Sequence, residues 1–156
     1  MRDTRTAVTD DDLFLGTIPS EIVGIQYYDG KVLADETVLF EREPANSHDR
    51  NAIRVENLDF EQVGHLPRKE AAWIAPLIDC GKLRIAGSVD STYYPSQDTY
   101  HNTIPIRLHL YLSPKGNTVF QKDDNPHNAF GALHEVIRIA LENTSRYNNP
   151  ETTESI

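Results

Sequence analysis

The sequence has only one cysteine among its 156 residues, Cys80, so neither a disulfide framework nor a cysteine-based metal site can form within the chain. No apolar run approaches the roughly 20 residues that a membrane-spanning helix needs, and the polar start MRDTRTAVTDDD lacks the apolar core of a secretory signal. The patterns GxxxxGK(S/T), GxSxG and HExxH are missing, and the six histidines do not cluster at metal-ligand spacing. We therefore expect a soluble protein that is not an enzyme, spans no membrane and carries no cofactor or metal ion.

Positive charge is also scarce. The chain has 15 Lys+Arg against 24 Asp+Glu, a formal net charge of -9, and residues 1–21, 22–113 and 114–156 carry net charges of -3, -4 and -2. Proteins that coat nucleic acid without regard to sequence show a basic surface. The charge therefore excludes that class of protein, whereas a small, local phosphate site stays open.

The chain divides into four parts. Residues 1–12 and 148–156 are polar and predict disordered tails. Residues 114–147 predict a linker followed by an amphipathic C-terminal helix over Pro126–Arg146. Residues 13–113 read as short strands punctuated by turns, with one helix over Arg68–Ile78 that Pro76 should kink or restart. The strands are expected at Leu13–Ile18, Ile22–Tyr28, Thr37–Arg42, Asn51–Asn57, Gln62–Leu66, Leu83–Val89 and Ile104–Leu112. This pattern predicts a mainly β protein, a small β-barrel with one short inserted helix and a C-terminal helix.

Three motifs follow one another with compatible spacing. They are VGIQYYDG at Val23–Gly30, REPANSHDRNAIRV at Arg42–Val55, and VGHLPR at Val63–Arg68. Together they resemble the HIRAN domain across about residues 20–112. The resemblance implies a modified OB-like barrel that binds single-stranded DNA ends carrying a free 3′-hydroxyl. The family's usual setting is the N-terminus of nuclear Swi/Snf-class DNA translocases, such as the helicase-like transcription factor and its fungal relatives, which act at stalled replication forks.

The adjacent tyrosines Tyr27 and Tyr28 are expected on one strand, where neighbouring side chains point to opposite faces. One ring can then lie in the core while the other presents a flat surface on which a base stacks. The resemblance places the stacking ring at Tyr27. The alternative is that both tyrosines only pack or line the surface.

Asp49 lies in a polar loop, and its carboxylate only accepts hydrogen bonds at neutral pH. It can accept one from a terminal 3′-OH, but it repels a 3′-phosphate. The family uses an aspartate at the matching position. The alternative is an Asx-turn that stabilises the loop itself, and the two roles can coexist. Cys80 is expected to be a small packing residue rather than a nucleophile.

Two residues depart from the family pattern. His48 stands where most members have a tyrosine, and Gln26 stands where the well-characterised members have a basic residue. Both changes weaken the contacts to bases and phosphates. Arg50, Arg68 and Lys69 remain as candidates to hold phosphates, the last two at a helix start, although a solvated helix start explains them too. The expected DNA-binding set is Gln26, Tyr27, His48, Asp49, Arg50, His65, Arg68 and Lys69.

His65 has two interpretations, as a contact to phosphate or to the loop around His48, or as a structural histidine. The favoured function is a non-catalytic module that recognises single-stranded DNA ends in a replication-fork or DNA-repair context. The alternative is a HIRAN-derived protein-interaction module that has lost DNA-end binding. In either case the C-terminal helix is a candidate for tethering the chain to a larger DNA-repair or chromatin protein, unless it packs on the barrel.

Overall fold

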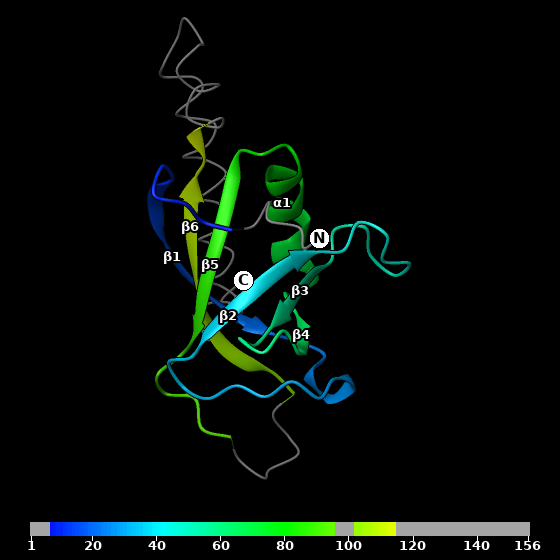
Figure 1. Ribbon diagram of the computed structural model, residues 1–156. Coiled ribbons are helices and arrows are strands. Elements are labelled where there is room, and N and C mark those ends of the chain that lie inside the picture. The colour runs from blue at the N-terminus through cyan, green and yellow to red at the C-terminus, as the bar shows by residue number, and fades with distance from the viewer. Residues whose placement is uncertain (1–6, 96–101, 115–156) are drawn as a thin grey trace, which may run out of the picture.

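The computed structural model describes residues 7–95 and 102–114 and shows a curled six-stranded sheet with one helix packed at its end (Figure 1). All strand pairs are antiparallel, and the order across the sheet is β1-β6-β5-β2-β3-β4. The strands are β1 (Leu13–Ile22), β2 (Thr37–Arg42), β3 (Ile53–Glu56), β4 (Gln62–His65), β5 (Leu83–Val89) and β6 (Ile104–Leu112). The helix α1 (Arg68–Asp79) connects β4 to β5. No helix in these described ranges has the length and apolar character needed to cross a membrane.

The two outer strands of the sheet meet just beyond the end of β1. Val23 donates its N–H to the carbonyl oxygen of His65 at 2.8 Å, and His65 donates back to Val23 at 3.0 Å. Because β1 and β4 stand at opposite ends of the strand order, this pair of hydrogen bonds closes the sheet on itself. The predicted barrel with one inserted helix is thereby confirmed.

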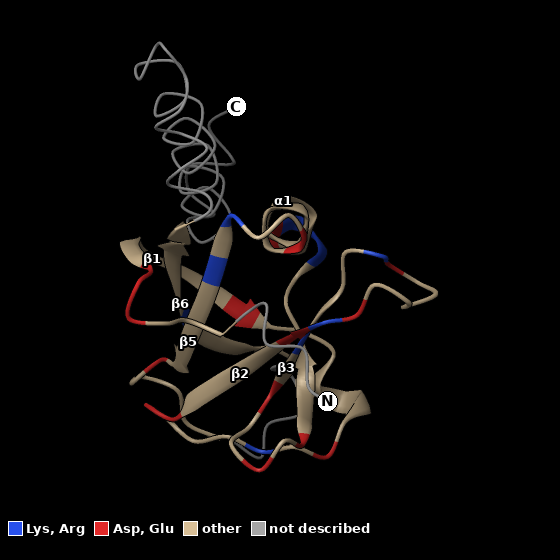
Figure 2. Ribbon diagram, turned by 45° about the horizontal axis from the view of Figure 1, so that its top comes forward, with Lys and Arg blue, Asp and Glu red and all other residues tan. Residues whose placement is uncertain are grey.

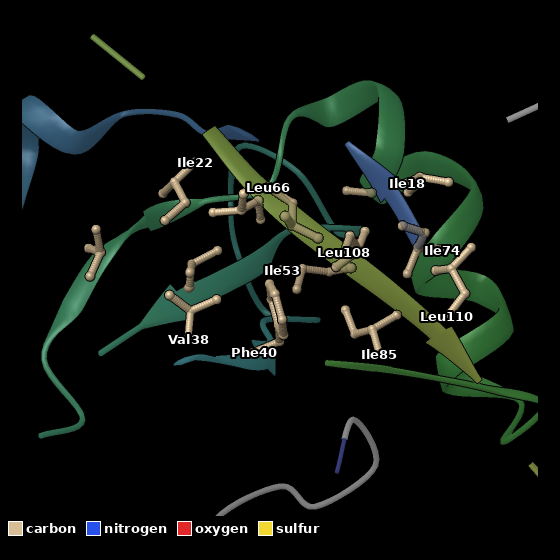
Figure 3. Close-up of a cluster of buried hydrophobic side chains, with 14 of the residues drawn as sticks. Ile18, Ile22, Val38, Phe40, Ile53, Leu66, Ile74, Ile85, Leu108 and Leu110 are labelled. Carbon is tan, nitrogen blue, oxygen red and sulfur yellow. The ribbon is translucent and has the colours of Figure 1, made fainter. Parts of the chain in front are cut away.

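The core follows from the alternation that the sequence shows along the longer strands. In β6 every second residue is buried, from Ile104 to Leu112, while the residues between them face outward. Ile74 on α1 packs against the same core as Ile18 and Leu110 (Figure 3). The helix therefore covers the opening of the barrel with its apolar face.

The helix α1 begins directly after Pro67 and continues through Pro76 to Asp79 as one helix, rather than restarting there. Pro76 lacks the N–H that would bond to the carbonyl of Ala72. Both residues lie on the exposed side of the helix, where water can satisfy that carbonyl. The expectation that Cys80 is a small packing residue is wrong, because this residue follows the last helical turn and is exposed.

Glu70 is the buried charge on α1. Burial raises the pKa of its carboxyl, in opposition to the hydrogen bond from its own backbone N–H and the nearby Lys69. This side chain faces the barrel and not the solvent around Arg68 and Lys69. The first helical turn therefore presents only its two basic side chains on the exposed side.

The predicted strand Ile22–Tyr28 is wrong. Strand β1 runs on through Pro19 to Ile22, and Pro19 is tolerated there because β1 has a partner only on one side, β6. Gly24 then takes a left-handed backbone conformation with φ 72°, which ends the extended chain. The residues after it form a 3-10 turn, η1 (Ile25–Tyr27).

The remaining expectations concern the two ends of the chain, for which the sequence predicts an N-terminal tail and a C-terminal linker, helix and tail. Residues 7–12 belong to the predicted N-terminal tail, and the structure shows a turn there in which Asp12 accepts a hydrogen bond from the backbone of Thr9 at 2.6 Å. Asp12 also lies 3.3 Å from Arg84 on β5. The predicted linker and C-terminal helix over residues 114–147 lie, after residue 114, outside the described residues, as does the tail over 148–156.

Gly64 tests the closure of the barrel. A Cβ at this position would overlap the carbonyl oxygen of Val23 and lie 2.7 Å from Cγ2 of Ile22. We expect Gly64→Ala to lower the free energy of unfolding by about 1–3 kcal/mol, since the added methyl forces β4 away from the chain after β1. Urea unfolding followed by tryptophan fluorescence measures the change. An alanine variant as stable as the wild type would contradict the close approach.

Candidate functional site

A hollow of about 280 Å³ lies at the point where the barrel closes. Three segments surround it: the turn after β1, the loop between β2 and β3, and the junction between β4 and α1. Its lining is contributed by Val23, Gly24, Tyr27, Tyr28, Asn46, His48, Asp49, Ala52, His65, Leu66 and Arg68. The three sequence motifs thus converge in space, and we call this hollow the closure pocket.

The structure brings most of the predicted binding residues together. Five of the eight line the closure pocket, namely Tyr27, His48, Asp49, His65 and Arg68. The other three lie nearby but outside the lining. Gln26 is exposed on η1, Lys69 is exposed on the first turn of α1, and Arg50 lines an adjoining hollow that shares Asp49.

The two tyrosines differ in exposure, although they do not lie on a strand. Tyr27 is 77% exposed at the end of η1, whereas Tyr28 is partly buried and meets the ring of His65 edge-on at 5.7 Å. The 3-10 turn produces this difference, since Tyr27 donates its N–H to Gly24 and turns its ring outward. One flat aromatic face is therefore open to solvent at the rim of the closure pocket.

The loop that carries Asp49 is organised by side-chain acceptors. Asn46 Oδ1 accepts hydrogen bonds from the backbone N–H groups of His48 at 2.9 Å and Asp49 at 3.2 Å. Asp49 Oδ1 in turn accepts from the N–H of Asn51 at 2.9 Å. The predicted Asx-turn at Asp49 is therefore present, and it aims a partly buried carboxylate at the pocket.

Arg68 ties the start of α1 to this loop. Its Nη2 donates to the carbonyl oxygen of His48 at 2.9 Å, across 20 residues of sequence. A guanidinium has five N–H donors, so one such bond leaves donors for an acceptor in the pocket. Arg68 thus places a positive charge in the lining of the pocket.

His65 contacts the loop between β2 and β3 through Glu43, which sequence analysis did not select. The Nε2 atom of His65 pairs with Oε1 of Glu43, and its ring packs against Tyr28. This pairing shows the contact to the loop around His48, and it equally fits a structural histidine with satisfied ring nitrogens. Glu43 lies within the REPANSHDRNAIRV motif, so the motif itself held the signal for this pair.

A buried arginine, Arg42, also holds the loop between β2 and β3 through hydrogen bonds to its backbone. Arg42 is 5% exposed and makes a two-pronged ion pair with Asp79 at 2.8 and 2.9 Å. It also donates to the carbonyl oxygens of Arg50 at 2.8 Å and Ala52 at 2.5 Å. Since Asp79 ends α1, the loop is fixed at its base to the last turn of the helix and at its tip to the first.

Comparison with known proteins identifies the family. The HIRAN domain model matches residues 15–115, and the chain belongs to the HIRAN domain family. The helicase-like transcription factor of Mus musculus is 32% identical over 143 residues, which are 90% of this chain and 14% of that protein. A putative SWI/SNF-related matrix-associated actin-dependent regulator of chromatin (subfamily A member 3-like 1) of Arabidopsis thaliana is 38% identical over 101 residues, 65% of this chain and 11% of that protein. The chain thus spans a small part of these relatives' own length.

Solved structures agree with this assignment. The crystal structure of the HIRAN domain of human HLTF superposes with a TM-score of 0.60 at 28% identity, over 72% of this chain and 88% of that one. The HLTF HIRAN domain has also been solved by NMR in its DNA-bound conformation, and it matches with a TM-score of 0.56 at 29% identity, over 71% of this chain and 87% of that one.

Asn46 tests the organisation of the loop. We expect Asn46→Ala to lower the free energy of unfolding by about 1–2 kcal/mol, because two backbone N–H groups lose their acceptor. Asn46→Asp is the matched control, since its carboxylate keeps an oxygen at the same place. Urea unfolding, together with hydrogen exchange of the His48 and Asp49 amides, measures both effects. Equal exchange in the wild type and the alanine variant would show that Asn46 does not hold the loop.

Proposed function

We propose that this domain is a non-catalytic module that binds the end of single-stranded DNA carrying a free 3′-hydroxyl. The proposal rests on one observation above all. Tyr27, His48, Asp49 and Arg68, which come from three motifs spread over more than 40 residues, line one concave pocket with the Tyr27 ring 77% exposed at its rim. That arrangement supports DNA-end binding over the alternative, a module that has lost it.

Each side chain has a chemical part in this proposal. Tyr27 and His48, both exposed, flank the terminal bases and stack on them. Asp49 accepts the hydrogen bond of the 3′-OH. Arg68 supplies charge-assisted hydrogen bonds to the last phosphate, next to the N–H groups at the start of α1.

The residues outside the pocket lining have supporting parts. Arg50 and Lys69 are exposed on either side of the pocket and contribute local positive charge to phosphates further along the strand. Gln26, next to the stacking ring, donates a neutral hydrogen bond to a phosphate. His65 acts by fixing Glu43 and Tyr28 in place rather than by touching DNA.

The names of the relatives support a proposal for the biological setting. Those with long matches are named as a helicase-like transcription factor and as a regulator of chromatin. We extend this context to the present chain and place it in the nucleus, at replication forks or in DNA repair. A pocket of this size holds about two nucleotides, so the affinity of the isolated domain is expected in the micromolar range. Tethering to a partner on the same DNA would raise its effective concentration.

Asp49 provides the first test. Short single-stranded oligonucleotides ending in a 3′-OH or a 3′-phosphate are titrated by fluorescence anisotropy at low salt. We expect the wild type to bind the hydroxyl end about tenfold or more tightly, since a hydrogen bond to a charged acceptor is worth roughly 1.5–3 kcal/mol. Asp49→Asn keeps the Oδ1 that forms the turn and removes the charge, so it should bind the two ends within a few-fold of each other.

The control is Asp59→Asn, which removes one exposed carboxylate from the turn between β3 and β4. It should keep the preference for the hydroxyl end, and thereby separates the pocket carboxylate from net charge. Equal affinity of the wild type for both ends would refute end recognition. Absence of binding up to about millimolar protein would favour the alternative, an interaction module.

Tyr27 provides the second test. Tyr27→Ala should weaken binding of the 3′-OH oligonucleotide by roughly 5- to 150-fold, because base stacking on an aromatic ring is worth about 1–3 kcal/mol. Tyr94→Ala removes an equally exposed tyrosine, 82% exposed, that does not line the closure pocket, and should leave affinity unchanged. The same anisotropy titration measures both. A Tyr27→Ala variant that binds like the wild type would exclude stacking at this position.

A further inference from the structure

A second surface lies away from the closure pocket and carries exposed apolar side chains. Leu33 is 59%, Leu58 57% and Phe60 54% exposed. Leu33 belongs to the loop between η1 and β2, and the other two belong to the turn between β3 and β4. We call these two segments, residues 29–36 and 57–61, the distal surface.

The distal surface is one unit because hydrogen bonds hold its two segments together. Asn57, which is buried, donates from Nδ2 to the carbonyl oxygen of Lys31 at 3.2 Å. Gly30 donates its N–H to Gln62 at 2.9 Å, and a Cβ at Gly30 would lie only 2.5 Å from that same oxygen. The two backbones are therefore packed directly against each other.

The turn between β3 and β4 is also held internally. Asn57 Oδ1 accepts hydrogen bonds from the N–H groups of Asp59 and Glu61, both at 3.0 Å, and Phe60 donates to the carbonyl of Asn57 at 3.0 Å. This network forces Phe60 to a φ of 64°. Glycine or asparagine suits that conformation, whereas a bulky residue is strained in it.

The strain at Phe60 is informative because its ring stays more than half exposed. Backbone strain of this kind is unfavourable and concentrates at functional positions. Exposed apolar side chains gathered on one surface mark interaction sites. The two observations are independent, and both point to a ligand on this surface.

Charge defines the kind of ligand. The two segments hold five carboxylates and one lysine, and acidic residues mark the loops below β2 and β3 in Figure 2. A second copy of the chain would bring like charges together, and a nucleic acid would be repelled. The carboxylates are Asp29, Asp35, Glu36, Asp59 and Glu61, and the lysine is Lys31.

We propose that the distal surface binds a basic amphipathic segment of a protein partner, whose apolar side chains contact Leu33, Leu58 and Phe60 while its Lys or Arg side chains face the surrounding carboxylates. An amphipathic helix with apolar anchors along one face is the common form of such a ligand. The turn that carries Leu58 and Phe60 lies at the end of the β3–β4 hairpin opposite His65, and no residue of the distal surface lines the closure pocket. This inference does not depend on DNA binding.

The test uses three synthetic 18-residue peptides. The first has leucines along one helical face and lysines elsewhere, the second replaces the lysines by glutamates, and the third replaces the leucines by serines. Binding to the full chain is measured by isothermal titration calorimetry and by backbone amide chemical shifts. We expect only the first peptide to bind tightly, with shifts confined to residues 29–36 and 57–61 and their neighbours.

Two variants make the result specific. Leu58→Ser with Phe60→Asn should weaken the first peptide about tenfold or more, since two buried apolar contacts are lost. Asparagine relieves the strained φ, so this variant should remain folded. Phe14→Ser removes an equally exposed ring on β1 and should leave peptide binding unchanged.

Several results would overturn the inference. They are failure of the first peptide to bind, unchanged binding in the Leu58→Ser, Phe60→Asn variant, or loss of binding in Phe14→Ser. A dimer of the wild type that this double variant dissociates, seen by analytical ultracentrifugation, would make a second copy the occupant and would also refute it. Oligonucleotide anisotropy on the same variant should be unchanged, which keeps failure here distinct from failure of the pocket.

Discussion

The structure depends on one close approach of two backbones, where Val23 and His65 exchange hydrogen bonds and close the barrel. This approach is possible because Gly64 has no side chain to place between the strands. It joins the first and last strands of the sheet order and so completes the core. The same contact sets the turn that begins at Gly24 beside His65, and this positions both tyrosines at the closure pocket. His65 thus takes part both in the closure of the barrel and in the lining of the closure pocket.

The opposite wall of the closure pocket is held by polar contacts rather than by apolar packing. The loop between β2 and β3 has a buried arginine at its base, Arg42, paired with the end of α1. At its tip, Arg68 reaches back from the start of α1. A buried charge pair is costly to desolvate, but its fixed geometry specifies position well. The 12-residue helix α1 therefore holds the loop between β2 and β3 at both its base and its tip. Asp49 lies on this loop.

Much of this could be predicted from the sequence. Alternation along β6 and helical spacing after Pro67 are local signals, and both elements formed where expected. The apolar and aromatic residues of Ile22–Tyr28 predict a strand, and this prediction is wrong because Gly24 ends the extended chain through a left-handed φ that composition does not reveal. The pairing of His65 with Glu43 and the burial of Arg42 depend on contacts between residues that are far apart in the sequence. Such contacts have no local signature, and only the motif order indicated them.

The chain has a net charge of -9, which is unfavourable for binding DNA. The effect of this charge on the proposed DNA ligand depends on where the acidic residues lie. Screening at physiological salt weakens the influence of an exposed charge beyond about 8 Å, and the carboxylates of the turn around Leu58 lie at the opposite end of the β3–β4 hairpin from the pocket residue His65. At the pocket itself, one guanidinium and an exposed ring face a carboxylate that a phosphate end would meet unfavourably. Affinity there would come from shape and hydrogen bonding more than from charge. On the proposed function, a negatively charged protein would discriminate between strand ends without attracting the strand as a whole.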